Sequence, residues 1–205
     1  MSLKMFPKIK LNLIRKDAKD SLYKDYSGRT KNKRSVFLCL YLIPAFISIV
    51  LLVNGILVEK DFANFLVTGI SIFAGLFFGL LFIVNEKYNS RKQILSEDSN
   101  EETINYLKRY KIFASQLVSQ ISYTICISIA LIIINSIILL FYNVKITMIM
   151  LILNKYDLIE IGNLSLVYII NGILFYLSAQ LIYFILVILS STYVMLMDDL
   201  DFEQD

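Results

Sequence analysis

The chain has 205 residues, of which 57% are hydrophobic and only 18% are charged, and its formal net charge is +3. Soluble domains carry charge on about a quarter of their residues, so this composition excludes an ordinary soluble domain and indicates a membrane protein. Histidine is absent, which removes the commonest general base and metal ligand. Cys39 and Cys126 both lie in apolar runs, where we expect small buried side chains rather than a disulfide or a zinc site.

Residues 1–34 form a basic arm with eleven lysines and arginines against three aspartates. Residues 9–13 alternate as in a strand, but four apolar residues would share one face of a helix: Leu11, Ile14, Ala18 and Leu22. We favour a short amphipathic helix after Pro7 that lies at the membrane surface. Because an apolar run follows directly, we expect the cations to contact anionic lipid and to set the topology rather than to bind nucleic acid.

The first predicted span covers about residues 35–58, a run of 24 uncharged residues that is long enough to cross a bilayer. The run is too long for a signal-peptide core, so we expect it to be retained. Pro44 lies within it and is predicted to bend the helix, because proline removes one backbone donor and frees a carbonyl.

The second predicted span covers about residues 62–85 and follows a tight charged turn at residues 59–61. It contains Gly69, Gly75 and Gly79, of which the last two form a G-x-x-x-G pattern. Small residues at this spacing let another backbone approach closely. These glycines are therefore the candidates for helix packing, either within the chain or between copies of it.

Residues 86–111 form the longest polar segment between spans, with six basic and five acidic residues. Ser99 and Glu102 have the spacing of a capping box, which predicts a helical hairpin with its tip near residues 96–100. This extension would either dock a soluble partner or serve as a solvated connection.

The third predicted span covers about residues 112–142, within 33 residues that carry no charge. Polar residues recur along one side of this helix, at spacings of four and then seven: Gln116, Gln120, Thr124, Ser128 and Asn135. An unpaired amide or hydroxyl in hydrocarbon is costly, so this polar stripe is predicted to face protein or water inside a bundle.

Within the segment 145–163, the apolar part between Lys145 and Lys155 is too short to cross. It is predicted to be a re-entrant or interfacial piece or part of the neighbouring bundle. Asp157, Glu160 and Gly162 predict a turn. The fourth span then covers about residues 164–195, within an uncharged run of 37 residues whose excess length implies tilt, extension or a non-helical start. The polar residues of this span are Asn171, Ser178 and Gln180. We expect them either to hydrogen-bond to Gln116 or Asn135 or to line a pore.

Residues 198–205 form a tail with five acids and no base. The tail is either disordered or a docking peptide for a basic partner. The candidate docking residues are Asp198, Asp199, Asp201, Phe202 and Glu203.

The predicted fold is an all-α integral membrane protein with four transmembrane helices in a membrane domain of residues 35–197. Four spans put both termini on one side. The arm and the 86–111 segment together carry seventeen lysines and arginines, whereas the opposite side has three. The positive-inside rule then places both termini in the cytoplasm. The many isoleucines, lysines and asparagines point to an AT-rich bacterial coding sequence, and hence to the inner (plasma) membrane.

No predicted span contains a carboxylate, lysine or arginine, which argues against proton relays, voltage sensors and ion-coupled transporters. Motifs for phosphate binding, hydrolysis or metal binding are also absent, so we expect neither an enzyme nor a cofactor. The leading hypothesis is an oligomeric sensor or anchor that signals to a cytoplasmic partner. One alternative is a pore that depolarises the membrane, formed by several copies of the chain and lined by the polar stripe. The other is a small transporter or permease component.

The layout resembles that of the small four-helix membrane subunits of bacterial anti-phage defence systems, in particular the Kiwa system. The resemblance lies in the basic arm Lys8–Arg34, the small external turns, the cytoplasmic segment Asn85–Lys111 and the acidic end Asp198–Asp205. It implies a homo-oligomer in the inner membrane that senses a disturbance of the envelope during infection and works with a cytoplasmic effector. The resemblance identifies no functional residues.

Overall fold

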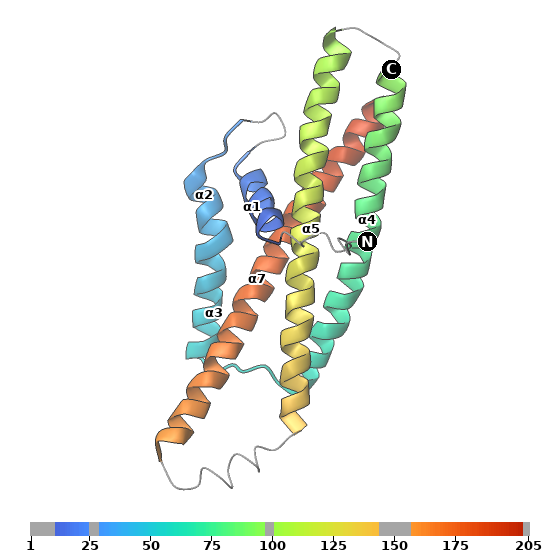
Figure 1. Cartoon of the computed structure of the whole chain (residues 1–205). Helices are drawn as coiled ribbons and strands as arrows, with labels where there is room; N and C mark the ends of the chain where they lie inside the picture. The colour runs from blue at the N-terminus through green and yellow to red at the C-terminus, as the bar shows by residue number, and fades with distance from the viewer. Residues whose placement is uncertain (1–10, 25–28, 97–100, 144–156, 203–205) are drawn as a thin grey trace, which may run out of the picture.

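The computed structural model describes residues 11–24, 29–96, 101–143 and 157–202 (Figure 1). These residues form helices and no β-strand. The elements are α1 (Leu11–Leu22), α2 (Lys33–Phe37), the π-helix η1 (Leu38–Leu42), α3 (Ile43–Val53), α4 (Lys60–Ser96), α5 (Glu101–Asn143) and α7 (Asp157–Phe202).

Four helical stretches are long and apolar enough to cross a membrane, namely Lys33–Val53, Lys60–Gln93, Thr103–Leu139 and Val167–Asp198. The first of these is one continuous path through α2, η1 and α3. The predictions of an all-helical chain and of four apolar helices are therefore confirmed.

The backbones of these helices pack in the order α3, α7, α5 and α4, with the shorter α1 lying against α5 (Figure 1). Burial follows this order, because 39% and 33% of the most apolar windows of α5 and α7 are buried, against 22% for the first span and for α4. Helices α5 and α7 are thus the two inner members of the packing, and the C-terminal half of α7 also meets α4.

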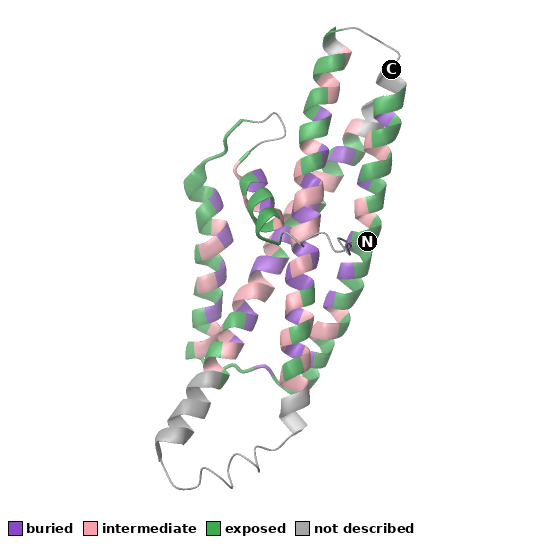
Figure 2. Ribbon diagram, viewed as in Figure 1, coloured by how far each residue is buried: buried purple, intermediate pink, exposed green. Residues whose placement is uncertain are grey.

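The buried side chains form two apolar clusters along the facing sides of the helices (Figure 2). Leu131, Leu174 and Phe184 lie in the larger cluster, where α5 and α7 meet the first span. Leu117 and Ile188 lie in the second, where α4 and α5 meet the C-terminal half of α7.

Large apolar side chains also cover the outer faces of the helices. Phe46, Phe65 and Phe82 are each 69% or more exposed. A continuous apolar surface is unfavourable in water, whereas contact with lipid tails carries no such penalty. The surface therefore agrees with a membrane-spanning protein.

Two sequence predictions about α7 are wrong. The turn expected at Asp157, Glu160 and Gly162 is helical, since α7 begins at Asp157. Acidic side chains in the first turn stabilise a helix, because they lie at the positive end of its dipole. A single glycine within a helix is tolerated. The tail is also helical as far as Phe202, so the disordered alternative does not hold for Asp198–Phe202.

The connection between α4 and α5 is only partly described. The two helices pack antiparallel, α4 ends at Ser96 and α5 begins at Glu101 (Figure 1). Of the tip expected near residues 96–100, Ser96 is helical and residues 97–100 lie outside the described residues. The apolar segment between Lys145 and Lys155, residues 1–10 and Glu203 also lie outside them.

Candidate functional site

The polar stripe of α5 faces the interior of the chain. Gln120, Thr124, Ser128 and Asn135 are each 5% exposed or less, and Gln116 is half-buried. Thr124 Oγ1 donates to the Gln120 carbonyl at 2.8 Å, and Asn135 Nδ2 donates to the Leu131 carbonyl at 2.8 Å. The stripe therefore faces protein, as its period predicted.

Several oxygens in this region accept no hydrogen bond from the described residues. On α5 they are Gln120 Oε1, Ser128 Oγ and Asn135 Oδ1. On α7 the Ser178 hydroxyl also lacks a hydrogen-bond partner among the described residues. A buried polar atom without a partner costs about 1–3 kcal/mol. Along α5 these atoms form a line of unused hydrogen-bonding capacity.

Helix α1 docks on this stripe. Gln120 Nε2 donates to Ser21 Oγ at 3.1 Å, and Ser21 Oγ donates to the Ala18 carbonyl at 2.6 Å. Ala18, Ser21 and Leu22 are buried. The helix expected after Pro7 is thus present from Leu11, but its apolar face contacts α5 rather than a bare membrane surface.

A second contact holds α1 against the first span. Lys19 Nζ donates to Tyr41 Oη at 2.6 Å and lies 4.7 Å from the centre of the Tyr41 ring. Tyr41 belongs to η1, so α1 bridges the first and third spans in the gap that Figure 1 shows between them.

The hydrogen bonds that Asn171 and the backbone at Gly172 make outside α7 go to α3 and to the connection that follows it, not to α5. Asn171 Oδ1 accepts from the Val58 backbone N–H at 2.8 Å, and Ser48 Oγ donates to the Gly172 carbonyl at 2.8 Å. The expected pairing of Asn171 and Gln180 with Gln116 or Asn135 is therefore wrong. The partners of this face of α7 are Ser48 of α3 and Val58 in the connection between α3 and α4.

Gln180 compensates for Pro44. Proline has no N–H for the carbonyl four residues earlier, which here is that of Leu40, and Gln180 Nε2 donates to this carbonyl at 3.1 Å. The π-helix Leu38–Leu42 lies directly before the proline. The backbone irregularity predicted from Pro44 is thus a π-helical turn, in which the helix is locally wider, and the Gln180 side chain of α7 stabilises it.

The predicted packing glycines contact no other helix. A Cβ added at Gly69, Gly75 or Gly79 would meet nothing within 4 Å, whereas a Cβ at Gly172 would lie 3.0 Å from Leu52 Cδ1. In the described part of the chain, close helix approach therefore occurs at Gly172 and not at the G-x-x-x-G pattern. Sequence reasoning missed Gly172, although its neighbour Asn171 had already marked that face.

Sequence reasoning also missed a polar cluster that joins three helices. Arg91 on α4 donates to Asp198 Oδ2 on α7 at 2.6 Å and to the Tyr106 hydroxyl on α5. Tyr106 also donates to Asp198 at 2.8 Å, and the Arg91 guanidinium lies 4.5 Å from the centre of the Tyr110 ring. The Arg91 side chain is 6% exposed and that of Asp198 43%.

This cluster changes the interpretation of Asp198, which was expected to dock a partner and instead pairs within the chain. The side chains of Asp199, Asp201 and Phe202 lie outside the described set, so their role in docking stays a prediction. An arginine just beyond a span is a weak signal by itself, because such residues are usually solvated.

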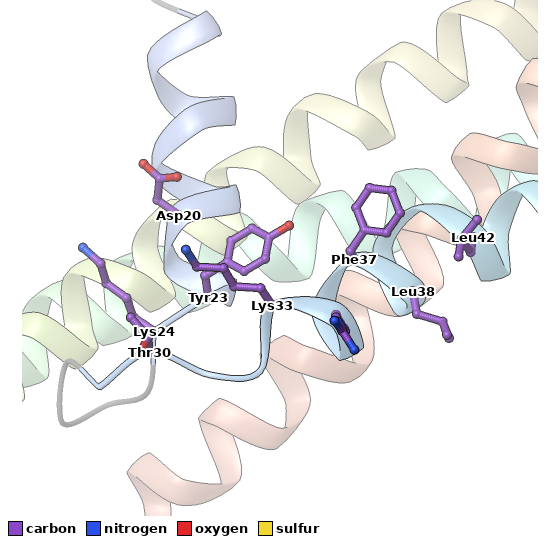
Figure 3. A pocket seen from close by; sticks show the side chains of 9 residues that line it. Asp20, Tyr23, Lys24, Thr30, Lys33, Phe37, Leu38 and Leu42 are labelled. Carbon is purple, nitrogen blue, oxygen red and sulfur yellow. The ribbon is translucent and has the colours of Figure 1, made fainter.

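The largest pocket described lies between the end of α1 and the start of the first span (Figure 3). It has a volume of about 840 Å³. Charged and apolar side chains both line it, the former including Lys24 and Lys33 and the latter Phe37, Leu38 and Leu42. The pocket borders the docking site of α1.

The four helices that are long and apolar enough to cross a membrane, together with the outward apolar surface, indicate a membrane-spanning helical protein. No protein-family model, no curated protein and no solved structure matches it. The functional assignment therefore rests on the chain's own geometry.

Proposed function

We propose that this chain is a non-enzymatic subunit of a bacterial inner membrane that couples a membrane event to a cytoplasmic partner. The observation that carries the proposal is the docking of α1. A helix with charged outer residues is attached to the membrane domain through Ser21 on Gln120 and Lys19 on Tyr41. The proposal takes α1 as the movable element of the subunit, with a docked position and a released one.

The proposed orientation has both termini in the cytoplasm, because seventeen lysines and arginines lie on that side and three on the other. In this orientation α1 faces the cytoplasm. So do three helix ends, namely the C-terminal ends of α4 and α7 and the N-terminal end of α5. The cluster of Arg91, Tyr106 and Asp198 ties these three ends together. They would form a firm platform for the partner, with α1 as the adjustable part.

The same proposal takes the subunit as a homo-oligomer. The face of α4 at Gly75 and Gly79 is exposed and meets no other described part of the chain. Its small-residue spacing suits a second membrane helix, and the copy that supplies it would be another subunit. A role in anti-phage defence, with envelope disturbance as the event, follows from the resemblance in layout.

The test compares locked and free α1. Cysteines replace Ser21 and Gln120 in a background with Cys39→Ser and Cys126→Ser, and a short bifunctional thiol reagent with a cleavable disulfide joins them. Reductant then releases the same sample. We expect a co-purifying cytoplasmic protein whose recovery differs at least severalfold between the locked and released states. A monomer that co-purifies with nothing, or equal recovery in both states, would contradict the proposal.

A pore is the second candidate, favoured by the unpaired acceptors Gln120 Oε1, Ser128 Oγ and Asn135 Oδ1. Because these residues are buried within the chain, a wet path would run alongside α5 inside each subunit rather than between copies. In liposomes, Gln120→Leu and Ser128→Ala are expected to abolish ion leak if this path conducts. Leak that both variants preserve would reject it.

A further inference from the structure

The pocket between α1 and α2 combines two kinds of lining. Lys24 follows α1, while Lys33 and Arg34 begin α2, and all three are exposed and line the pocket (Figure 3). Among the described residues none of these cations forms an ion pair with a carboxylate. Of the described residues that line the pocket, Asp20 is the one acid against three cations, so this lining is net positive and suits an anion.

The other part of the lining is apolar. Phe37, Leu38 and Leu42 also line the pocket, and each is between 47% and 52% exposed. Figure 3 shows them following the first span away from the charged end. The pocket therefore extends from cations at the start of the span to apolar side chains about two turns further along it.

This order of charges and apolar side chains selects the ligand. A free phosphate would satisfy the cations and leave the apolar part uncovered. A phospholipid supplies a phosphate and an acyl chain in the same order, and an anionic headgroup adds attraction to Lys and Arg at a membrane surface. Lys33 is also the first residue of the first apolar stretch, so the pocket lies where headgroups would lie.

We infer that this pocket binds one anionic phospholipid, with its phosphate on Lys24, Lys33 and Arg34 and one acyl chain along Phe37, Leu38 and Leu42. A phosphate between Lys24 and Lys33 joins the end of α1 to the start of α2. Bound lipid therefore stabilises the docked position of α1. The inference names the ligand of the sensing element and, for this consequence, rests on the proposed function.

The experiment measures lipid retention by native mass spectrometry of the full-length protein from detergent, with phosphatidylglycerol and phosphatidylcholine offered in turn. We expect selective retention of phosphatidylglycerol. The variant Lys33→Gln/Arg34→Gln should bind it about thirtyfold more weakly, at roughly a factor of five for each lost charge. The control Lys92→Gln/Lys108→Gln removes two exposed cations elsewhere and should retain the lipid.

Two further arms separate the sources of the phosphate. Leu38→Ser is expected to weaken phosphatidylglycerol binding severalfold, and inorganic phosphate at millimolar concentration is expected not to displace it. Displacement by inorganic phosphate, unchanged binding in Leu38→Ser, or equal loss in the control variant would each overturn the inference.

This assay uses no partner protein, so its failure is distinct from failure of the proposed function. Selective lipid retention with no co-purifying protein would leave the lipid site in place and remove the sensor. A partner that depends on α1 locking, together with equal retention of both lipids, would remove the lipid site alone.

Discussion

The α3–α7 contact and the outer face of α4 both present glycine, but only the first uses it. At Gly172 the two helices approach so closely that a Cβ would lie 3.0 Å from Leu52 Cδ1, while Gly75 and Gly79 face open space. The recognised spacing belongs to the face without a neighbour. A small-residue motif thus shows that close approach is permitted, not that it occurs.

Polar neighbours distinguish the two faces better than spacing does. Gly172 is adjacent to Asn171, which bonds to Val58, and its own carbonyl accepts from Ser48. Gly75 instead lies between Ala74 and Leu76, and Leu76 is 64% exposed. At Gly172 the hydrogen bonds that leave the helix, rather than the spacing of small residues, mark the face that packs inside the chain.

The largest expected effect comes from filling the close contact. Gly172→Leu should lower the free energy of unfolding by about 3 kcal/mol, because the added side chain overpacks the contact with α3. Gly172→Ala should cost less, since the Leu52 side chain can move aside. Thermal unfolding in detergent measures both, and a Gly172→Leu protein as stable as the wild type would contradict this account of the contact.

Removing the carboxylate that joins the ends of α4, α5 and α7 comes next. Asp198→Ala leaves the buried Arg91 with one of its two described polar acceptors and should cost about 2 kcal/mol. Glu86→Ala, which removes an exposed acid from the same helix as Arg91, is the control and should be nearly silent. Equal shifts in melting temperature for the two variants would mean that the cluster adds no specific stability.

The Gln180 contact is expected to be weaker. Gln180→Leu removes the hydrogen bond that Gln180 donates to the Leu40 carbonyl and should cost about 1 kcal/mol. In a Pro44→Ala background the restored N–H can serve this carbonyl, so the same Gln180 substitution should cost much less there. The double-mutant cycle on unfolding free energies tests this coupling, and strictly additive costs would count against it.

The smallest effect on folding belongs to the outer face. Gly75→Leu/Gly79→Leu should change stability by less than about 0.5 kcal/mol, because no described part of the chain contacts these positions. Particle mass in detergent should nevertheless fall to that of a monomer if copies meet there. An unchanged oligomer would move the contact between copies elsewhere, and clear destabilisation would mean that the face packs within the chain.

Much of the architecture could be predicted because a bilayer restricts what a chain can do. Four apolar runs predicted the four stretches that are long enough to cross a membrane. The spacing of Gln120, Thr124 and Ser128 predicted that these three side chains are buried. The pairs Arg91–Asp198 and Ser21–Gln120 could not be predicted, since each joins residues about 100 positions apart. The start of α7 was missed because acids and a glycine are as compatible with a helix N-terminus as with a turn.

The docking of α1 has a mechanical consequence for the bilayer. Ser21 contacts Gln120, which lies nine residues beyond Lys111, or roughly 13 Å along the helix. Arg15, Lys16, Asp17 and Asp20 of α1 remain exposed and keep their hydration. In the proposed orientation these charges would lie below the headgroups. We expect headgroups and water to reach down to them and thin the leaflet on that flank of the protein, so that a change in membrane thickness would act there first.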